Sequence, residues 1–316
     1  MDIVALAGGV GGAKLAYGLY RVCPPGSLTV VVNTGDDFEH LGLWISPDLD
    51  TVCYTLAELA NPLTGWGLDG DSFAALHGLS VLGGPDWFQI GDRDLATHLE
   101  RTRRLKMGQS LSQITRDFCR SWGVQAAVFP MSDQRVSTLV DTVDSGRLAF
   151  QEYFVHQQCR PVVSGFSFDG VDSAQPAPGV LDAISAASLI VICPSNPWVS
   201  IEPILQVRGI RAALRQKVVV AVSPIVGGKA IKGPAAKMYA EMGLKPSAET
   251  VARQYAELIT GMVVDLEDRE EADRLNRSGI ISLVTQTVMR SPQNRCRLAS
   301  EVVQFGESLL RRVTGS

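Results

Sequence analysis

The sequence is poor in the residues that mark several specialised classes of protein. Its 316 residues include only six cysteines, and these are scattered without a C-x-x-C pair. That scatter excludes the usual zinc-ribbon and dithiol spacings and predicts free thiols in a reducing compartment. The four histidines follow no metal-ligand spacing either.

Strong charge and long apolar stretches are also missing. The net charge is −4, so no basic surface favours a nucleic-acid partner. No apolar run is long enough to span a bilayer, and the chain enters an apolar strand pattern at Ile3 rather than a signal peptide. We therefore expect a cytoplasmic protein that binds neither membranes nor nucleic acid.

What the sequence does have is an ordinary globular balance, with 46% hydrophobic and 20% charged residues. Its length suits one large α/β domain or a domain with an insertion, and a core of that size needs no disulfide. Short apolar runs alternate with helical patterns, which predicts an α/β, doubly wound, mostly parallel Rossmann-like sheet. The runs expected as strands are 3–7, 28–32, 126–129, 189–193, 218–222, 262–264 and 281–284.

The chain is organised around a glycine-rich segment after the first apolar run. Residues 8–14 read GGVGGAK and precede a helical pattern that begins at Leu15. Glycine lets a backbone approach a ligand closely, and the free N–H groups of a first helical turn face anions. We therefore expect a phosphate ligand here rather than a plain turn. The expected binding residues are Gly8, Gly9, Gly11, Gly12 and Lys14.

This segment matches neither of two familiar phosphate-binding patterns. A dinucleotide fingerprint requires a third glycine where Lys14 stands and an acid near the place of Asn33. A Walker loop requires Ser or Thr where Leu15 stands. An NAD-dependent dehydrogenase is therefore disfavoured, and the phosphate hypothesis depends on the four glycines and the lysine.

Polar or glycine-rich tips follow three further apolar runs, at 33–37, 194–200 and 223–229. The carboxyl ends of parallel strands face one crevice in a doubly wound sheet, so these tips are expected to share a ligand site. Hydroxyl and amide groups suit a base or ribose, or simple helix capping, and the Gly-Gly-Lys of the last tip resembles a second phosphate nest, although its lysine could instead be solvated. The nucleotide-binding residues expected at these tips are Asn33, Thr34, Ser195, Asn196, Ser200, Gly227, Gly228 and Lys229.

The stretch from 46 to 123 has the spacing of several helices and no strand pattern. We therefore divide the chain into an α/β nucleotide-binding core, formed by 1–45 and 124–316, and a helical insertion formed by 46–123. After 124 the segments 136–143 and 148–155 alternate in the manner of a β-hairpin.

Three charged residues lie near the expected helix starts of the insertion. Asp50 falls in a first turn, where a negative charge is favourable in any helix. Asp92 is the expected N-cap of a later helix. Arg93 follows it, and a cation at that position opposes the helix dipole, which favours an anionic or planar ligand for Arg93.

Together these segments resemble the 2-phospho-L-lactate transferase family. The resemblance covers nearly the whole chain in order. It is carried by GGVGGAK at 8–14, NTGDD at 33–37, SPDLDT at 46–51, GDRDLAT at 91–97, PSNP at 194–197 and VSPIVGGKAIKGP at 222–234.

The resemblance implies a transferase of coenzyme F-420 biosynthesis. Such an enzyme moves a phospholactyl or phosphoenolpyruvyl group from a guanosine-diphosphate-linked donor to a ribityl hydroxyl of the deazaflavin Fo (7,8-didemethyl-8-hydroxy-5-deazariboflavin) and releases GMP. It also implies magnesium as the cofactor and a homodimer. The sequence does not distinguish the lactyl from the enolpyruvyl donor.

The family's functional positions fall on particular residues here. Asp50 and Arg93 stand where the family contacts Fo, and the strand tips stand where the donor nucleotide lies. Magnesium prefers one or two carboxylates together with substrate phosphates, so we assign Asp36 and Asp37 to the metal. Asp50 is expected to orient the Fo hydroxyl or act as its base.

One departure from the family pattern lies at Asp133, which is followed by Gln134 where the family often has two acids. This leaves the role of a second acid open. The strongest alternative from another class is a nucleotide-sugar-binding metabolic regulator of the related gluconeogenesis-factor family, which shares the glycine segment and NTGDD but lacks transferase activity. The helical insertion with its GDRD segment favours the enzyme.

Overall fold

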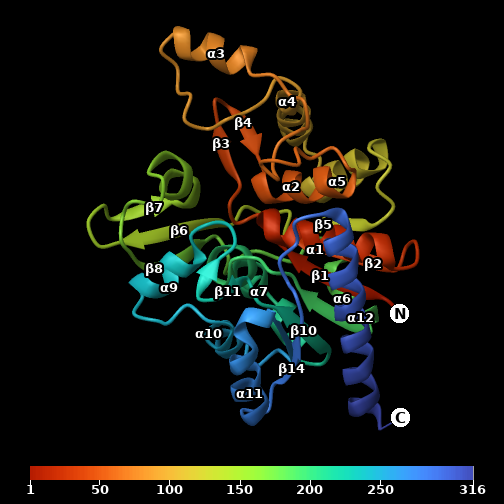
Figure 1. The fold of residues 1–316 in the computed structure, drawn as a ribbon. Helices are drawn as coiled ribbons and strands as arrows, with labels where there is room; N and C mark the ends of the chain where they lie inside the picture. Colours follow the sequence, from red (N-terminus) through yellow and green to blue (C-terminus); the bar gives the residue numbers. More distant parts are fainter. Residues whose placement is uncertain (316) are drawn as a thin grey trace.

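A seven-stranded parallel sheet forms the centre of the computed structural model, which describes residues 1–315 (Figure 1). In chain order the strands are β1 (Ile3–Ala7), β2 (Leu28–Val32), β5 (Ala127–Pro130), β9 (Leu189–Ile192), β10 (Val218–Val222), β13 (Gly261–Val264) and β14 (Ile281–Val284).

The sheet has the strand order β14-β13-β10-β9-β1-β2-β5, and every neighbouring pair is parallel. From β1 the chain builds one edge through β2 and β5. It then returns to pair β9 with β1 and builds the other edge. The order therefore reverses between β1 and β9, which is the switch point of a doubly wound sheet and confirms the expected fold class.

Side chains of β1 alternate between two hydrophobic cores, as the pleat of a strand requires. Val4 and Leu6 join one core, whereas Ile3, Ala5 and Ala7 join the other. The first core is covered by α6 (Val180–Ala186), α7 (Glu202–Gln206), α8 (Ile210–Leu214), α9 (Ala235–Glu241), α10 (Ala248–Gln254) and α11 (Arg269–Arg277). The second is covered by α1 (Gly9–Val22), α2 (Pro47–Leu56), α5 (Leu111–Ser121) and α12 (Pro292–Thr314).

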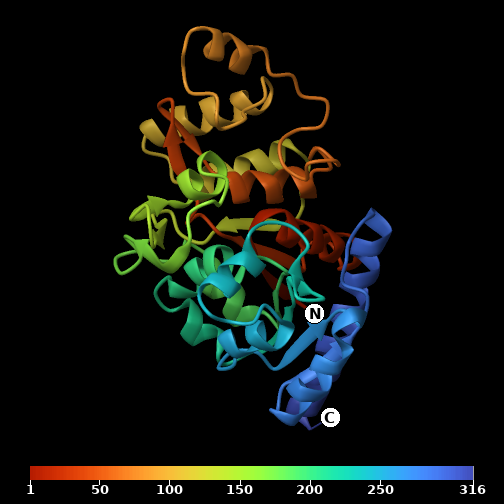
Figure 2. The ribbon, with the colours of Figure 1, turned by 60° about the vertical axis from the view of Figure 1, so that its left-hand side comes forward.

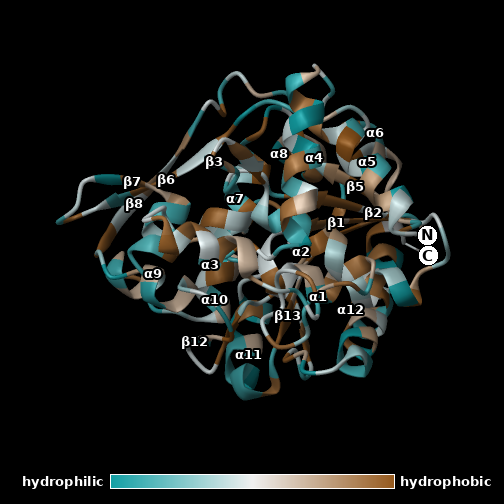
Figure 3. Cartoon of the chain, turned by 90° about the horizontal axis from the view of Figure 1, so that it is seen from above, coloured by the Kyte–Doolittle hydropathy of each residue, from teal (hydrophilic) through white to brown (hydrophobic). Residues whose placement is uncertain are grey.

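The hydropathy of the chain follows this layering. Figure 3 shows β1 and β2 as hydrophobic strands inside the molecule, with hydrophilic residues on the outer helices α4 (Asp94–Lys106) and α11. All six cysteines are free thiols, as expected. Within residues 1–315, no helix combines the length and hydrophobicity that a bilayer crossing requires.

The segment expected as a helical insertion contains α2, α3 (Ala74–Val81), α4 and α5, and it lies to one side of the sheet (Figures 1 and 2). It is not uniform in its packing. Leu49, Val52 and Leu56 of α2 share a core with α1, whereas α3 has no buried residue.

Several local elements differ from the sequence expectation. The stretch 38–47, which carried no strand prediction, contains a two-stranded hairpin of β3 (Phe38–His40) and β4 (Leu43–Ile45). The expected hairpin after 136 is present as β6 (Ser137–Thr142) and β7 (Arg147–Ala149), with β8 (Val163–Asp169) as a third strand. The second expected strand of this hairpin, 148–155, is shorter than predicted, because the π-helical turn η1 (Glu152–His156) follows β7.

On the other side of the sheet, the helical stretch 197–214 is broken. It consists of a π-helical turn, η2 (Pro197–Ile201), followed by α7 and α8. The break between α7 and α8 falls at Gly209, whose φ of 84° no α-helix accommodates. A short hairpin of β11 (Ile225–Val226) and β12 (Lys229–Ala230) follows β10, and a 3-10 turn, η3 (Leu266–Asp268), precedes α11.

Candidate functional site

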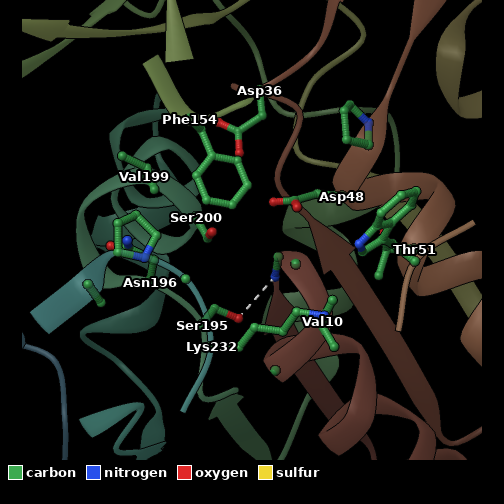
Figure 4. A pocket seen from close by; sticks show the side chains of 18 of the residues that line it. Val10, Asp36, Asp48, Thr51, Phe154, Ser195, Asn196, Val199, Ser200 and Lys232 are labelled. Carbon is green, nitrogen blue, oxygen red and sulfur yellow. Dashed lines mark hydrogen bonds between the residues drawn. The ribbon is translucent and has the colours of Figure 1, made fainter. Parts of the chain in front are cut away.

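A cavity of about 590 Å³ opens at the switch point of the sheet. Its floor is formed by the start of α1 after β1, the turn 194–200 after β9, and the start of α2. This is the place where doubly wound proteins bind their ligands. Figure 4 shows Asp36, Asp48 and Ser200 directed toward the centre of the cavity, with Lys232 near Val10 on another side.

The glycine segment is helical rather than a free loop, which corrects the expected helix start at Leu15. Helix α1 begins at Gly9, with Gly8 in the N-cap position. A Cβ at Gly11 would collide with the carbonyl oxygen of Pro194, and one at Gly12 would collide with the Ser195 hydroxyl. These two glycines are therefore required by the close packing of α1 against the turn after β9.

The first N–H groups of α1 already have protein partners. The N–H of Gly8 donates to the Ser195 hydroxyl at 3.1 Å, and the N–H of Gly9 donates to the carboxylate of Asp48. The next two residues, Val10 and Gly11, line the cavity. N–H groups in a first helical turn have no intrahelical acceptor, so these two remain for an anionic ligand.

Asp48 is a site residue that the sequence reasoning missed, because an acid at the start of a helix is favourable whatever its function. Its carboxylate lies at the N-terminus of α1 and accepts the Asn33 side-chain amide at 2.9 Å. Burial raises its pKa to about 6, although the bonds from Asn33 and Gly9 act against that rise. The available signal was the spacing SPDLD, which places two acids at the start of one helix.

Asn33 itself is buried and does not line the cavity. Besides Asp48, its amide contacts the carbonyl of Val199 at 3.2 Å, and its oxygen accepts the N–H of Gly35 at 2.8 Å. Thr34 is also buried away from the cavity. Both residues were expected to bind nucleotide, but Asn33 is placed to position Asp48.

The two consecutive acids Asp36 and Asp37 face different surroundings. Asp37 accepts the Ser46 hydroxyl at 2.7 Å and the Trp44 indole at 3.2 Å, and it does not line the cavity. Burial raises the pKa of Asp37 to about 8. Asp36 lines the cavity, and its buried Oδ1 has no hydrogen-bond partner. Burial, followed by the charge of Asp48, raises the pKa of Asp36 well above its usual range.

The structure therefore pairs Asp36 with Asp48 at the cavity instead of with Asp37. Two carboxylates, one with an unpartnered oxygen, fit the one or two acids that Mg²⁺ takes beside substrate phosphates. In the described part of the chain, no group of three or more histidine, cysteine or acidic side chains could hold a metal alone. The donor set thus suits a metal that shares its ligands with a phosphate.

Asp50 lines the cavity but is bound from behind by a buried arginine. Both of its oxygens accept from Arg101, one from Nη1 at 3.0 Å and the other from Nη2. His98 lies beside this pair, with Nδ1 3.3 Å from the Arg101 Nη1 and Nε2 3.4 Å from Asp94. Tyr54 donates to Asp94 at 2.6 Å. Sequence reasoning did not identify Arg101, because nothing in its local pattern reveals its partner.

Arg93 does not reach the cavity with Asp50. Its side chain is exposed and donates to the carbonyl of Asp69 at 2.9 Å. The expected cap Asp92 instead accepts the first N–H groups of α3, at 2.9 Å each. The cap of α4 is Asp71, which accepts N–H groups at its start at 2.8 and 3.0 Å. The two aspartates thus cap each other's helices and close the segment 71–92 at its base.

Two lysines bring positive charge to the cavity, Lys14 and Lys232. Burial lowers the pKa of Lys14, and the charges of Arg295 and Lys232 lower it further. Within the described residues neither lysine forms an ion pair, and Lys232 donates to the carbonyl of Thr64. Two cations that repel each other at a cavity, and that form no ion pair with its acids, indicate an anionic ligand.

The expected second phosphate nest lies outside the cavity lining. Gly227 and Gly228 form the tight turn of the β11–β12 hairpin, with φ of 55° and 73°, as a type I′ turn requires. The N–H of Gly227 is taken by the carboxylate of Asp268 at 3.0 Å, and Lys229 is exposed. Lys232, three residues further on, is the lysine that reaches the cavity.

The turn 194–200 after β9 does lie at the cavity. Its three polar residues expected in the ligand site, Ser195, Asn196 and Ser200, all line the cavity. Asn196 also caps η2, because its oxygen accepts the N–H of Trp198 at 3.0 Å. The hydroxyls of Ser195 and Ser200 offer uncharged hydrogen bonds beside the start of α1.

An aromatic cluster forms the opposite wall of the cavity. Trp87, Phe88 and Phe154 all line the cavity. The ring centroids of Trp87 and Phe88 lie 5.8 Å apart, and behind them Phe38 contacts Phe88 at 4.9 Å. Such a wall suits a large planar ligand. Three of its residues come from segments that carried no site expectation, since aromatic residues in loops have no diagnostic spacing.

The fold and the site together define a doubly wound α/β protein with an anion-binding and aromatic cavity at its switch point. The sequence model described as 2-phospho-L-lactate transferase CofD matches residues 3–290. The chain therefore belongs to the 2-phospho-L-lactate transferase family, and so to a family of transferases.

Similar proteins carry two different names within this family. The phosphoenolpyruvate transferase of Streptomyces griseus is 40% identical over 98% of this chain and 99% of its own length. The 2-phospho-L-lactate transferase of Methanopyrus kandleri is 38% identical with the same coverage. These relatives favour the transferase over the nucleotide-sugar-binding regulator.

Solved structures give the fold independently. A UPF0052 family member from Bacillus halodurans has a TM-score of 0.61 and 17% identity, with 96% of this chain and 98% of that chain covered. At this identity the likeness shows the fold alone.

Proposed function

We propose that this protein transfers a phospholactyl or phosphoenolpyruvyl group from a guanosine-diphosphate-linked donor to the ribityl hydroxyl of Fo. The hydroxyl oxygen forms a bond to the phosphorus that bears the three-carbon acid. The bond from that phosphorus to the GMP phosphate breaks, and GMP departs with the proton that the hydroxyl releases. The product is a phosphodiester of coenzyme F-420 biosynthesis.

The observation that carries this proposal is the division of one cavity into two chemically different ends. Lys14, Lys232 and the start of α1 supply positive charge and free N–H groups for a diphosphate. Trp87 and Phe88 supply an apolar wall for a deazaflavin ring. A transferase that joins an anionic donor to a planar acceptor requires both ends within reach of each other.

We further propose that Mg²⁺ is held by Asp36 and Asp48 rather than by Asp36 and Asp37. When bound there, the metal would neutralise negative charge on the transferred phosphate. Phosphoryl-type transfer depends mainly on positioning and charge neutralisation. The chain itself contributes Lys14 and Lys232 to the same task, while Ser195 and Ser200 offer hydroxyls to the donor nucleotide.

The donor is tested by supplying both candidates to the same enzyme. The lactyl and enolpyruvyl acids share a carboxylate and differ by one unsaturation, and relatives of both names are similarly close to this chain. We expect Fo to be converted with release of one GMP for each product. Failure of both donors in the presence of Mg²⁺ would overturn the proposed reaction.

Binding is tested by titrating Fo through its own fluorescence, with GDP and Mg²⁺ present and absent. We expect saturable binding that GDP strengthens, because both ligands occupy one cavity. If Fo fails to bind under every condition and a UDP-sugar binds instead, the regulator alternative is correct.

Two lysines provide a matched pair for the donor end. Lys232→Met should weaken GDP binding about tenfold, which corresponds to about 1.4 kcal/mol. Lys229→Met should leave it unchanged, because Lys229 is exposed and outside the cavity lining. Calorimetric titration with GDP separates the two. Equal losses in both variants would contradict the placement of the phosphates.

The family resemblance also leads us to propose a homodimer. Light scattering during gel filtration should give about twice the 34.0 kDa of one chain. A single-chain mass at micromolar concentration would contradict this.

A further inference from the structure

Asp50 is held by a buried arginine. Arg101 is 2% exposed, and its guanidinium binds both oxygens of the Asp50 carboxylate. Burying an arginine is costly unless it is paired, and a two-point bond fixes the orientation of the carboxylate as well as its charge. Asp50 lines the cavity, whereas Arg101 lies behind it.

His98 extends this arrangement in a defined orientation. Its Nδ1 lies 3.3 Å from Nη1 of Arg101. Arginine has only donors, so a hydrogen bond between these two atoms requires Nδ1 to accept. The same nitrogen lies 3.7 Å from Oδ2 of Asp50, and Nε2 lies 3.4 Å from Asp94, which also accepts the Tyr54 hydroxyl at 2.6 Å. The ring is therefore held from both sides.

This geometry limits what Asp50 can do for a ligand. A carboxylate that receives two bonds from one guanidinium is held in a single orientation, and each of its oxygens already has one donor. It still has lone pairs that face the cavity and can accept a hydrogen bond. Asp50 is thus built to hold a hydroxyl in one direction.

We propose that Arg101 and His98 are positioning residues that fix the orientation of the Asp50 carboxylate, so that Asp50 orients the acceptor hydroxyl. This inference rests on the proposed function, because it takes the Fo hydroxyl as the group that Asp50 orients. It assigns the segment after GDRD a role in alignment, through His98 and Arg101, in place of the direct contact expected from Arg93.

The test is a double-mutant cycle between Asp50 and Arg101. Arg101→Lys keeps the charge but loses the two-point geometry, and we expect kcat to fall about 30-fold while GDP affinity stays within threefold. In the Asp50→Asn background the same Arg101→Lys change should lower kcat by less than threefold, because the group that it positions is already altered.

Two variants of His98 give a second test that leaves the Arg101 charge in place. His98→Leu removes the acceptor for Arg101 and should lower kcat about tenfold. His98→Asn can restore an acceptor near the Nδ1 position and should recover activity to within about threefold of wild type. If the Arg101 variant does not fold, as judged by circular dichroism and GDP binding, the His98 pair decides the question.

The results distinguish an error in the positioning role of Arg101 and His98 from an error in the proposed transfer reaction. Coupled losses in kcat with unchanged GDP affinity, and rescue by His98→Asn, support the inference. Additive losses in the Asp50–Arg101 cycle, or equal activity of the two His98 variants, overturn it while the proposed function stands. Absence of transfer by the wild-type protein overturns both.

Discussion

Replacing Asp48 with asparagine tests the electrostatics of the cavity directly. The fold raises the pKa of Asp48 from 3.8 to about 6, mainly through burial. Between these values the native protein binds more protons than the unfolded chain, so the free energy of unfolding falls as the pH rises. An asparagine at this position has no proton to lose, and its contribution to stability does not change over this range.

The size of the effect follows from the same two values. Their difference, at about 1.4 kcal/mol for each pH unit, corresponds to about 3 kcal/mol. The unfolding free energy of Asp48→Asn minus that of wild type should therefore increase by about 3 kcal/mol from about pH 3.5 to about pH 7.5. Loss of the Asp48 charge also relieves Asp36, which acts in the same direction.

Urea unfolding of both proteins across this pH range, with a chelator present to exclude metal binding, measures the difference. Asp172→Asn serves as the control, because it makes the same chemical change at an exposed position. Its difference from wild type should stay constant within about 0.5 kcal/mol. A difference for Asp48→Asn that is constant, or that decreases toward neutral pH, would refute the reasoning.

Further predictions concern packing, ligand and metal. Gly11→Ala should lower the free energy of unfolding by about 1–3 kcal/mol in urea, because its Cβ would collide with Pro194. Trp87→Ala should weaken Fo binding about tenfold in a fluorescence titration and leave GDP binding unchanged. Asp71→Ala and Asp92→Ala should each destabilise the segment between them by about 1 kcal/mol, which amide hydrogen exchange at the starts of α3 and α4 would report. Chelation should abolish transfer, and added Mg²⁺ should restore it; unchanged turnover in chelator would contradict the metal proposal.

The strands of the central sheet could be predicted because each one corresponds to a local pattern in the sequence. Strands buried on both faces read as short apolar runs, and each of the seven expected runs forms a strand of the central sheet. The position of the cavity follows from the fold, since the tips after β1 and β9 meet at the switch point. The π-helical turns and the β3–β4 hairpin lack such a pattern, and the sequence did not indicate them.

The partners within the site could not be predicted, because they depend on distances between remote segments. Two adjacent acids were expected to act together, yet Asp36 faces Asp48 across the cavity and Asp37 turns toward Ser46. A Gly-Gly-Lys segment was expected to bind phosphate, but Asp268 occupies the N–H of its first glycine. Local sequence indicates which groups are available, and only the tertiary fold decides which of them meet.

The mutual capping of α3 and α4 has a consequence for how ligands enter. The segment 71–92 carries Trp87 and Phe88 of the cavity wall, yet α3 has no buried residue. Figure 1 shows α3 at the top of the molecule, away from the central sheet. A segment with so little buried surface opens at a far lower free-energy cost than the whole protein. One wall of the cavity can therefore separate and re-form while the sheet stays intact. We therefore expect the rates at which a planar ligand arrives and departs to depend on this segment, independently of the chemistry at the switch point.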